Sequence, residues 1–272
     1  MSPAPAEQRF RFAGWELPGR LGPAPGRYVL RRFAGDDPQH VLVLREHARG
    51  GWRRGALAVP VTRAAVIEAA PVDLAAARAW FDDAAGAGAP RVLAAALAVL
   101  NRALAAHRIA AADPHVRELG PAAALVARVG YGTAAQVSAA SWERAREVPV
   151  AAARARRPER LELLLSGRDA ALACEELALR ARLDLDAGRD REAALQLRAA
   201  LDAAVAELEG FRELRAVAAR LGELRAGRAR MEAVAAEALL GGLDDAARAA
   251  VATVLGRLEA ALRVRAGGDL SR

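Results

Sequence analysis

The stretch RYVLRRFAGDDPQHVLVLRE at residues 27–46 decides the fold class. Its two short apolar runs, RYVLRRF (27–33) and QHVLVLRE (39–46), flank the sequence AGDDP (34–38). Runs of this length, rich in valine, leucine and aromatic residues and separated by glycine, aspartate and proline, are typical of a β-hairpin. The stretch therefore predicts two antiparallel strands.

Further apolar runs follow this hairpin. LAVPVTRAAVI (57–67) predicts a third strand, and its Pro60 favours a strand start or a sheet edge because proline has no N–H to donate. AAALVARVGY (122–131) predicts another strand, which ends at Gly130. If this strand pairs with the earlier ones, residues 27–147 form one small α+β domain.

The segments on either side of this domain differ from it in composition. Residues 1–26 are predicted to be an extended N-terminal segment, because LPGRLGPAPG (17–26) is dense in proline and glycine. Residues 148–160, VPVAAARARRPER, are predicted to be an arginine-rich linker. Beyond the linker, residues 161–266 are predicted to form a helical bundle domain.

Two helices are predicted in the first half of the chain and four in the second. Asp73 and Pro90 mark the starts of the first two, since aspartate caps free N–H groups and proline fits a first helical turn. Gly188 and Gly241 mark helix ends in the second half. Leucines at three-to-four spacing are predicted to form the buried stripe of the first bundle helix: Leu161, Leu164, Leu165, Leu172, Leu179 and Leu183.

The predicted fold class is α+β and predominantly α-helical. A small antiparallel sheet with helices is expected in the N-terminal half. An antiparallel helical bundle or coiled coil is expected in the C-terminal half.

A heptad-like pattern marks the third helix of the predicted bundle. Large apolar residues recur there at coiled-coil spacing, with Arg228 at the position before the last of them. This association seam comprises Leu214, Val217, Leu221, Leu224 and Met231. Alanine fills much of the remaining helical surface and buries little area, at about 25 cal/mol per Å² of apolar surface. A bundle with so thin a core is expected to pair with a second copy or with a partner protein.

The segment at residues 176–208 resembles one tetratricopeptide-type hairpin. It has a helix, an AGR turn (187–189) and a second helix rich in alanine and leucine. The sequence holds no second copy at that period, and such repeats bury a core only when about three are stacked. The resemblance implies a helical hairpin and carries no function.

All 40 basic residues are arginine, and the absence of lysine excludes several chemistries. A phosphate-binding loop ending in Gly-Lys-Ser/Thr, a Schiff-base lysine and a lysine general base all require that residue. Of the net charge of +7, residues 1–63 carry +6 (11 Arg against 5 Asp/Glu), whereas residues 151–272 carry +1 (21 Arg against 20). Since arginine codons are GC-rich, the position of the arginines indicates phosphate binding better than their number.

The strongest candidate for a binding function is REHARGGWRR at residues 45–54, with Arg31, Arg32 and Arg63 on neighbouring segments. Arginines on a glycine-containing loop can contact phosphates while a tryptophan stacks on a base. The structural alternative is an ordinary solvated hairpin loop. The residues predicted to contact nucleic acid are Arg45, Arg49, Trp52, Arg53 and Arg54.

Histidine and cysteine provide a weaker candidate for catalysis. His107, Asp113 and His115 lie near a predicted helix end, but their spacing matches no known metal signature. Cys174, the single cysteine, precedes two carboxylates within a predicted helix, which favours a small buried hydrophobe over a nucleophile. We expect no catalytic residue, no metal site and no cofactor.

The leading hypothesis is therefore a non-catalytic helical protein that self-associates or binds a protein partner. The alternative is a nucleic-acid-binding protein that uses the N-terminal arginine patch, and the second alternative is an enzyme with a His/Asp site. A single cysteine favours the reducing cytoplasm. The longest strongly apolar stretch, at residues 92–100, is shorter than the roughly 20 residues that cross a bilayer, so no membrane contact is expected.

Overall fold

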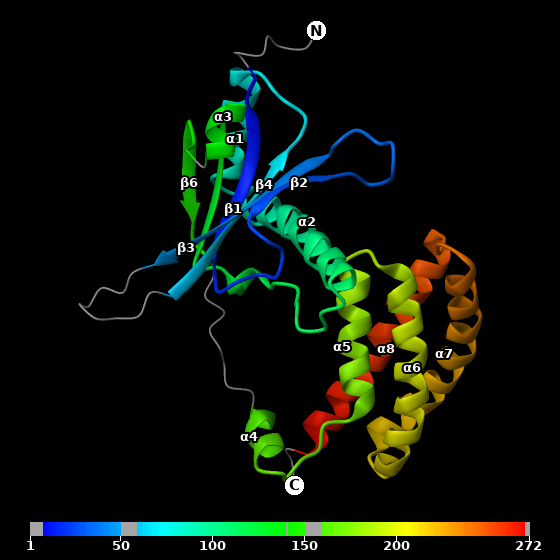
Figure 1. Ribbon diagram of the computed structural model, residues 1–272. Coiled ribbons are helices and arrows are strands. Elements are labelled where there is room, and N and C mark those ends of the chain that lie inside the picture. Colours follow the sequence, from blue (N-terminus) through cyan, green and yellow to red (C-terminus); the bar gives the residue numbers. More distant parts are fainter. Residues whose placement is uncertain (1–7, 50–58, 140, 151–158, 270–272) are drawn as a thin grey trace. The chain divides into compact units, whose positions relative to one another are not determined.

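The computed structural model describes residues 8–49, 59–139, 141–150 and 159–269 (Figure 1). The chain divides into two compact units, Met1–Ala155 and Arg156–Arg272, which we call the N-terminal unit and the C-terminal unit. The N-terminal unit holds an antiparallel sheet with helices, and the C-terminal unit is helical. The α+β, predominantly helical class predicted from the sequence is confirmed.

The sheet of the N-terminal unit has six strands in the order β2-β3-β4-β1-β5-β6, and every neighbouring pair is antiparallel. The predicted hairpin is present, with Val29 opposite Val41. The predicted strand at 122–131 does rejoin the earlier strands, because Arg128 pairs with Gly14. The strands are β1 (Phe10–Pro18), β2 (Gly26–Leu30), β3 (His40–Arg49), β4 (Val59–Glu68), β5 (Val126–Gly132) and β6 (Arg144–Val148).

The prediction that residues 1–26 are an extended segment outside the domain is wrong. Residues 10–18, FRFAGWELP, form strand β1, which lies in the middle of the sheet between β4 and β5. Residues 12–17, whose side chains alternate between the two faces of β1, are all buried. A strand buried on both faces lacks a clean alternation of polar and apolar residues, and the prolines and glycines at 17–26 obscured it further.

Three helices accompany the sheet: α1 (Leu74–Ala84), α2 (Ala89–Ala110) and α3 (Ala134–Ala139), with a 3₁₀ turn η1 at Pro121–Ala123. The Asp73 side chain caps α1 as predicted, since its Oδ1 accepts a hydrogen bond from the N–H of Ala76 at 2.7 Å. Pro90 lies in the first turn of α2, also as predicted. These helices divide the two faces of the sheet between them.

The helix α2 covers one face of the sheet. Its Leu97, Leu100 and Leu104 pack against sheet side chains that include Trp15 and Leu44. On the opposite face, α3 covers only part of the sheet through Val137. The remainder of that second face is open, and we call it the open face.

Among the described helices, α2 is long and apolar enough to cross a membrane by length and composition, with a mean hydropathy of 1.4. Its Leu97, Leu100 and Leu104 are buried in the core of the N-terminal unit. The absence of membrane contact stays a prediction.

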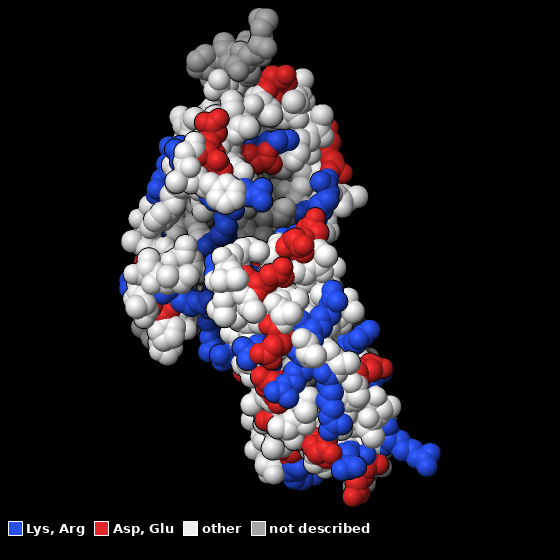
Figure 2. Space-filling model, turned by 90° about the vertical axis from the view of Figure 1, so that its right-hand side faces the viewer, with Lys and Arg blue, Asp and Glu red and all other residues white. Residues whose placement is uncertain are grey.

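The C-terminal unit contains α4 (Glu159–Leu165), α5 (Ala173–Asp186), α6 (Asp190–Leu208), a 3₁₀ turn η2 (Glu209–Phe211), α7 (Arg215–Leu240) and α8 (Asp245–Asp269). The four long helices enclose one core, whose largest side chains include Leu201, Leu208 and Leu255. Figure 2 shows arginine and carboxylate side chains interspersed over this unit on the face drawn. Pairs such as Arg198–Glu232 and Arg228–Asp202 account for this mixture, and the charge of the unit is balanced locally.

The predicted leucine stripe of the first bundle helix is wrong in two respects. The helix is interrupted between α4 and α5, where Gly167 has φ +71° and Leu172 is the N-cap of α5. In addition, Leu179 and Leu183 are exposed, whereas Cys174, Ala178 and Ala181 are buried. Small residues allow α5 to approach α6 closely, and α6 in turn buries Ala193, Ala194 and Ala200. Leucine spacing alone does not show which stripe of an alanine-rich helix faces inward.

A buried ionic cluster holds α4, the segment before α5 and α8 together. The carboxylate of Asp169 accepts from Arg160 Nε at 2.6 Å and from Arg265 Nη2 at 2.6 Å. Arg160 also binds Glu175, whose second oxygen accepts the N–H of Leu172 at the start of α5. Arg265 and Asp169 expose only 2% and 5% of their side chains. These charges are therefore compensated by one another instead of by water.

Candidate functional site

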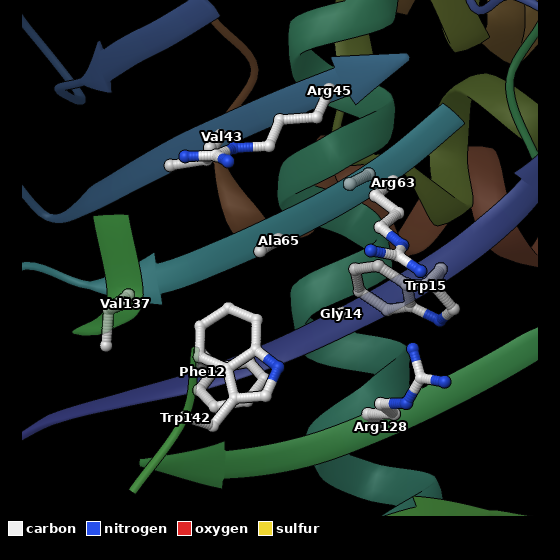
Figure 3. A pocket seen from close by; sticks show the side chains of 11 residues that line it. Phe12, Gly14, Trp15, Val43, Arg45, Arg63, Ala65, Arg128, Val137 and Trp142 are labelled. Carbon is white, nitrogen blue, oxygen red and sulfur yellow. The ribbon is translucent and has the colours of Figure 1, made fainter. Parts of the chain in front are cut away.

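A hollow of about 260 Å³ lies on the open face of the sheet (Figure 3). Strands β1, β3, β4 and β5, helix α3 and the segment before β6 contribute to it. In Figure 3 helix α2 runs behind the sheet, on the side away from the hollow. The lining residues are Phe12, Gly14, Trp15, Val43, Arg45, Arg63, Ala64, Ala65, Arg128, Val137 and Trp142.

Two small residues form the floor of the hollow. Gly14 on β1 lies opposite Ala65 on β4. A Cβ atom added at Gly14 would lie 3.2 Å from the carbonyl oxygen of Ala64, so the position is already close to its neighbouring strand. Because neither floor residue carries a long side chain, the open face is recessed at this point.

Two stacked aromatic rings form one wall. The rings of Phe12 and Trp142 lie 3.7 Å apart between centroids with an interplanar angle of 21°. The Phe12 ring lies over Gly130 of β5, where an added Cβ would come within 2.8 Å of Cε1. The segment that carries Trp142 is held by an ion pair between Arg9 and Glu143 and by the Ser141 N–H, which donates to the Gln136 carbonyl. The aromatic wall is thus fixed from both sides.

Arginines from three strands form the opposite, cationic side. Arg63 Nε and Arg128 Nη1 both donate to Oε1 of Glu16, each at 3.1 Å. Arg128 also donates to Glu147 on β6 at 2.7 Å. Glu16 lies on β1 between the two arginine-bearing strands and is only 4% exposed. The shared carboxylate oxygen shows that these guanidinium groups converge on a common point.

The charges of this group are mutually stabilised. Burial alone would raise the pKa of Glu16, but the hydrogen bonds and positive charge of Arg128 and Arg63 outweigh burial and hold the pKa below its ordinary value. For Arg128 burial acts in the opposite direction and would lower the pKa. The hydrogen bonds to Glu147 and Glu16 outweigh burial and raise the pKa of Arg128 above its ordinary value. Glu16 and Arg128 therefore remain ionised around neutral pH.

Arg45 is the least compensated cation of the group. It lies on β3 directly opposite Arg63 on β4, and its guanidinium donates to the backbone carbonyl of Ser138 at the end of α3. Within the described ranges no carboxylate lies in ion-pair distance of Arg45. Like charges at directly opposed positions of a sheet destabilise the pairing. The hollow therefore has a cationic side on which three arginines face two carboxylates, Glu16 and Glu147.

The structure describes only two of the five residues that are predicted to contact nucleic acid. Arg45 lines the hollow as described, and Arg49 is the last residue of β3. Trp52, Arg53 and Arg54 lie outside the described residues.

Sequence reasoning did not select Phe12, Arg128 or Trp142 as site residues. The available signal was a single charged residue inside an otherwise apolar run, as at Arg63 in VTRAAV and Arg128 in LVARVG. Such a residue must point to one face of the sheet, and only the strand order shows that several of them share that face.

The five seam residues do not face a partner surface. Val217, Leu221, Leu224 and Met231 are buried in the core of the C-terminal unit, and Leu214 is the N-cap of α7 and packs against that core. The predicted place of Arg228 on the seam is wrong, because Gly227 occupies it and an added Cβ there would lie 3.0 Å from Val254 Cγ1. Association through the seam would require this unit to open, and self-association stays a prediction.

His107, Asp113 and His115 are not brought together as a site. Asp113 Oδ1 accepts the backbone N–H of His115, while His107 packs beside Gly22. Throughout the part of the chain that the structure describes, no three His, Cys, Asp or Glu side chains are placed to hold a metal ion. The structure gives the His/Asp hypothesis no geometric support.

Cys174 lies inside the C-terminal core and is fully buried. Burial raises the pKa of its thiol, and the neighbouring Glu207 raises it further. A thiol in this environment stays protonated and is a poor nucleophile. The carboxylate of Glu207 accepts the N–H groups of Ala173 and Cys174, both at 3.0 Å, at the first turn of α5.

Comparison with known proteins adds no relative: no family model, no curated protein and no solved structure matches the chain.

Proposed function

We propose that the N-terminal unit is a non-catalytic binding module whose hollow takes an anionic ligand. The observation that carries this proposal is the opposition of Arg45 and Arg63 on neighbouring strands, with Arg128 beside them. A sheet built for stability alone gains nothing from two guanidinium groups at directly opposed positions. An anion that enters the hollow would accept charge-assisted hydrogen bonds from these guanidinium groups and offset the excess of positive charge.

Binding accounts for the lining residues better than catalysis does. A guanidinium stays protonated at every pH at which proteins function, so it cannot exchange protons with a substrate. Glu16 is bound to two guanidinium groups, and its lowered pKa makes it a weak base. The group can hold and orient negative charge, which is the chemistry of a recognition site.

Replacing Arg45 by glutamine is expected to weaken the binding of inorganic phosphate by tenfold or more. The variant removes one charge-assisted hydrogen bond, worth about 1.5–3 kcal/mol, and leaves the Glu16 pairs intact because Arg45 bonds to a carbonyl. Isothermal titration calorimetry with sodium phosphate, at constant ionic strength, measures the change.

Arg91→Gln is the matched control for this experiment. Arg91 lies on α2, on the other side of the sheet, and pairs with Asp83 at the surface. The Arg91→Gln variant should bind phosphate with the same affinity as the unmodified protein. Equal affinities in all three proteins, or no phosphate binding by any of them, would contradict the proposal.

A further inference from the structure

We infer that the ligand of the hollow is a nucleoside phosphate, with its phosphate bound by the arginines that line the hollow and its base against the Phe12–Trp142 stack. This inference rests on the proposed anion site and names the chemistry of its ligand. Its support is the pairing, within one hollow, of a cationic side and an aromatic side.

The cationic side and the aromatic side of the hollow are separated along the strands. The cationic row crosses β3, β4 and β1 at Arg45, Arg63 and Glu16, whereas the aromatic row crosses β1 at Phe12. Glu16 and Phe12 are four residues apart on one strand face, which corresponds to roughly 13 Å at about 3.3 Å per residue. The side chain of Arg45 extends along this interval, with its guanidinium beside Val43 (Figure 3). A ligand that reaches both sides has an anionic group and a flat group joined by a short spacer, which in a nucleoside phosphate is the sugar.

The aromatic wall of the hollow provides a surface on which a base can stack. Phe12 and Trp142 both line the hollow, and Trp142 is only partly buried. Figure 3 shows the two rings overlapping at one end of the floor, with the guanidinium groups of Arg63 and Arg128 at the other end. Stacking on aromatic side chains beside a cationic groove is how many proteins hold single nucleotides. An isolated inorganic anion would leave this wall unused.

The hollow is small. Its volume of about 260 Å³ is just below the roughly 300–1,000 Å³ that ligand pockets typically span. The floor at Gly14 and Ala65 admits a flat group close to the backbone. The hollow therefore suits one nucleotide unit, which can come from a free nucleotide or from a single-stranded nucleic acid.

The test measures the affinity of the full-length protein for a graded series of probes. Inorganic phosphate, ribose 5-phosphate and the four ribonucleoside 5′-monophosphates are titrated by calorimetry under one buffer condition. We expect at least one nucleoside monophosphate to bind about 5- to 100-fold more tightly than ribose 5-phosphate, because the base adds a stacking interaction. If every nucleoside monophosphate binds only as tightly as ribose 5-phosphate, the inference is overturned while the anion site stands. If none of the phosphates binds, both proposals fail.

Variants at Trp142 make this test specific to the aromatic wall. Trp142→Leu is expected to remove the preference for the nucleoside monophosphate, and Trp142→Phe, which keeps a stacking ring, is expected to retain most of it. Circular dichroism confirms that both variants are folded. A preference that survives in a folded Trp142→Leu protein would overturn the role assigned to the stack, and should that variant not fold, loss of the preference in Trp142→Phe would do so.

A ten-nucleotide single strand distinguishes the two sources of the ligand. Tighter binding of the oligonucleotide than of the monophosphates, with an affinity that falls steeply as salt is added, supports a single-stranded nucleic acid. Equal or weaker binding of the oligonucleotide supports a free nucleotide.

Discussion

Replacing Asp169 by alanine is expected to lower the free energy of unfolding of the C-terminal unit by about 3–5 kcal/mol. The substitution leaves Arg265, which exposes 2% of its side chain, without its closest carboxylate. It also removes one of the two acidic partners of Arg160. A buried charge that loses its partner keeps the cost of its removal from water and loses the compensating attraction. Urea unfolding of the full-length protein, followed by circular dichroism at the helix band, measures the loss.

Asp186→Ala provides the control for this prediction. Asp186 pairs with Arg182 at 3.7 Å at the surface of α5, and 65% of its side chain is exposed. Exposed pairs of this kind contribute about 0–1 kcal/mol. If the two variants lowered the free energy of unfolding by the same amount, the buried Asp169 cluster would contribute no more than an exposed ion pair. Adding Arg265→Met to Asp169→Ala should recover part of the stability, since an apolar side chain needs no counter-charge there.

The same cluster predicts a loss of stability in acid. Burial alone would raise the pKa of Asp169, but the bonds from Arg160 and Arg265 outweigh it and lower the pKa from 3.8 to about 2. Because the folded-state pKa is the lower one, this contribution is fully present above pH 3.8 and is lost as the pH falls towards 2. The difference in melting temperature between the unmodified protein and Asp169→Ala should therefore shrink between pH 5 and pH 2. A difference that is independent of pH would contradict the assignment.

Replacing Gly130 by alanine is the second substitution with a large expected effect, here on the N-terminal unit. An added Cβ would lie 2.3 Å from the carbonyl oxygen of Arg144 and 2.9 Å from the Cα of Ala145, both in the backbone of β6. It would also press on the Phe12 ring at 2.8 Å. Overpacking of this kind typically costs about 1–3 kcal/mol and more when backbone must move. We expect destabilisation of at least that size and, because the Phe12–Trp142 stack shifts, weaker ligand binding and altered tryptophan fluorescence.

Gly222→Ala is the matched control for Gly130→Ala. Gly222 lies within α7, and no atom lies within 4 Å of the position that its Cβ would take. Alanine at such a position should stabilise the helix by up to about 1 kcal/mol. If Gly130→Ala proved as neutral or as stabilising as Gly222→Ala, the close approach of β5 and β6 would be refuted.

The features predicted correctly from the sequence are those that depend on neighbouring residues. The hairpin at 27–46 has its turn between its strands, and Asp73 lies next to the N–H group that it caps. The strand β1 was missed because its pairing partners are far along the chain and its flanks contain proline and glycine. Inward-facing alanines of α5 were missed for a related reason, since only the neighbouring helix shows which stripe it contacts.

The candidate site could be predicted only to the extent of Arg45 and Arg63. Glu16, Arg63 and Arg128 come together because β1 lies between β4 and β5, and no local pattern encodes that order. The stack of Phe12 on Trp142 likewise joins two residues from distant segments. A binding site that is assembled by long-range strand order cannot be predicted from a single sequence without the fold.

The central place of β1 also has a consequence for synthesis of the protein on the ribosome. Strand β1 pairs with β4 and β5, as in the pairs Phe12–Ile67 and Phe12–Gly130. It therefore has no strand partner until β4 is translated, and it lacks its second partner until β5 follows. Closing the long loops between β1 and its partner strands slows folding. Until it is paired, an apolar strand exposes its unpaired edges to other chains. The helices of the C-terminal unit instead pack largely on their sequence neighbours and can assemble as they emerge. During synthesis, protection against aggregation therefore matters most for the first half of the chain.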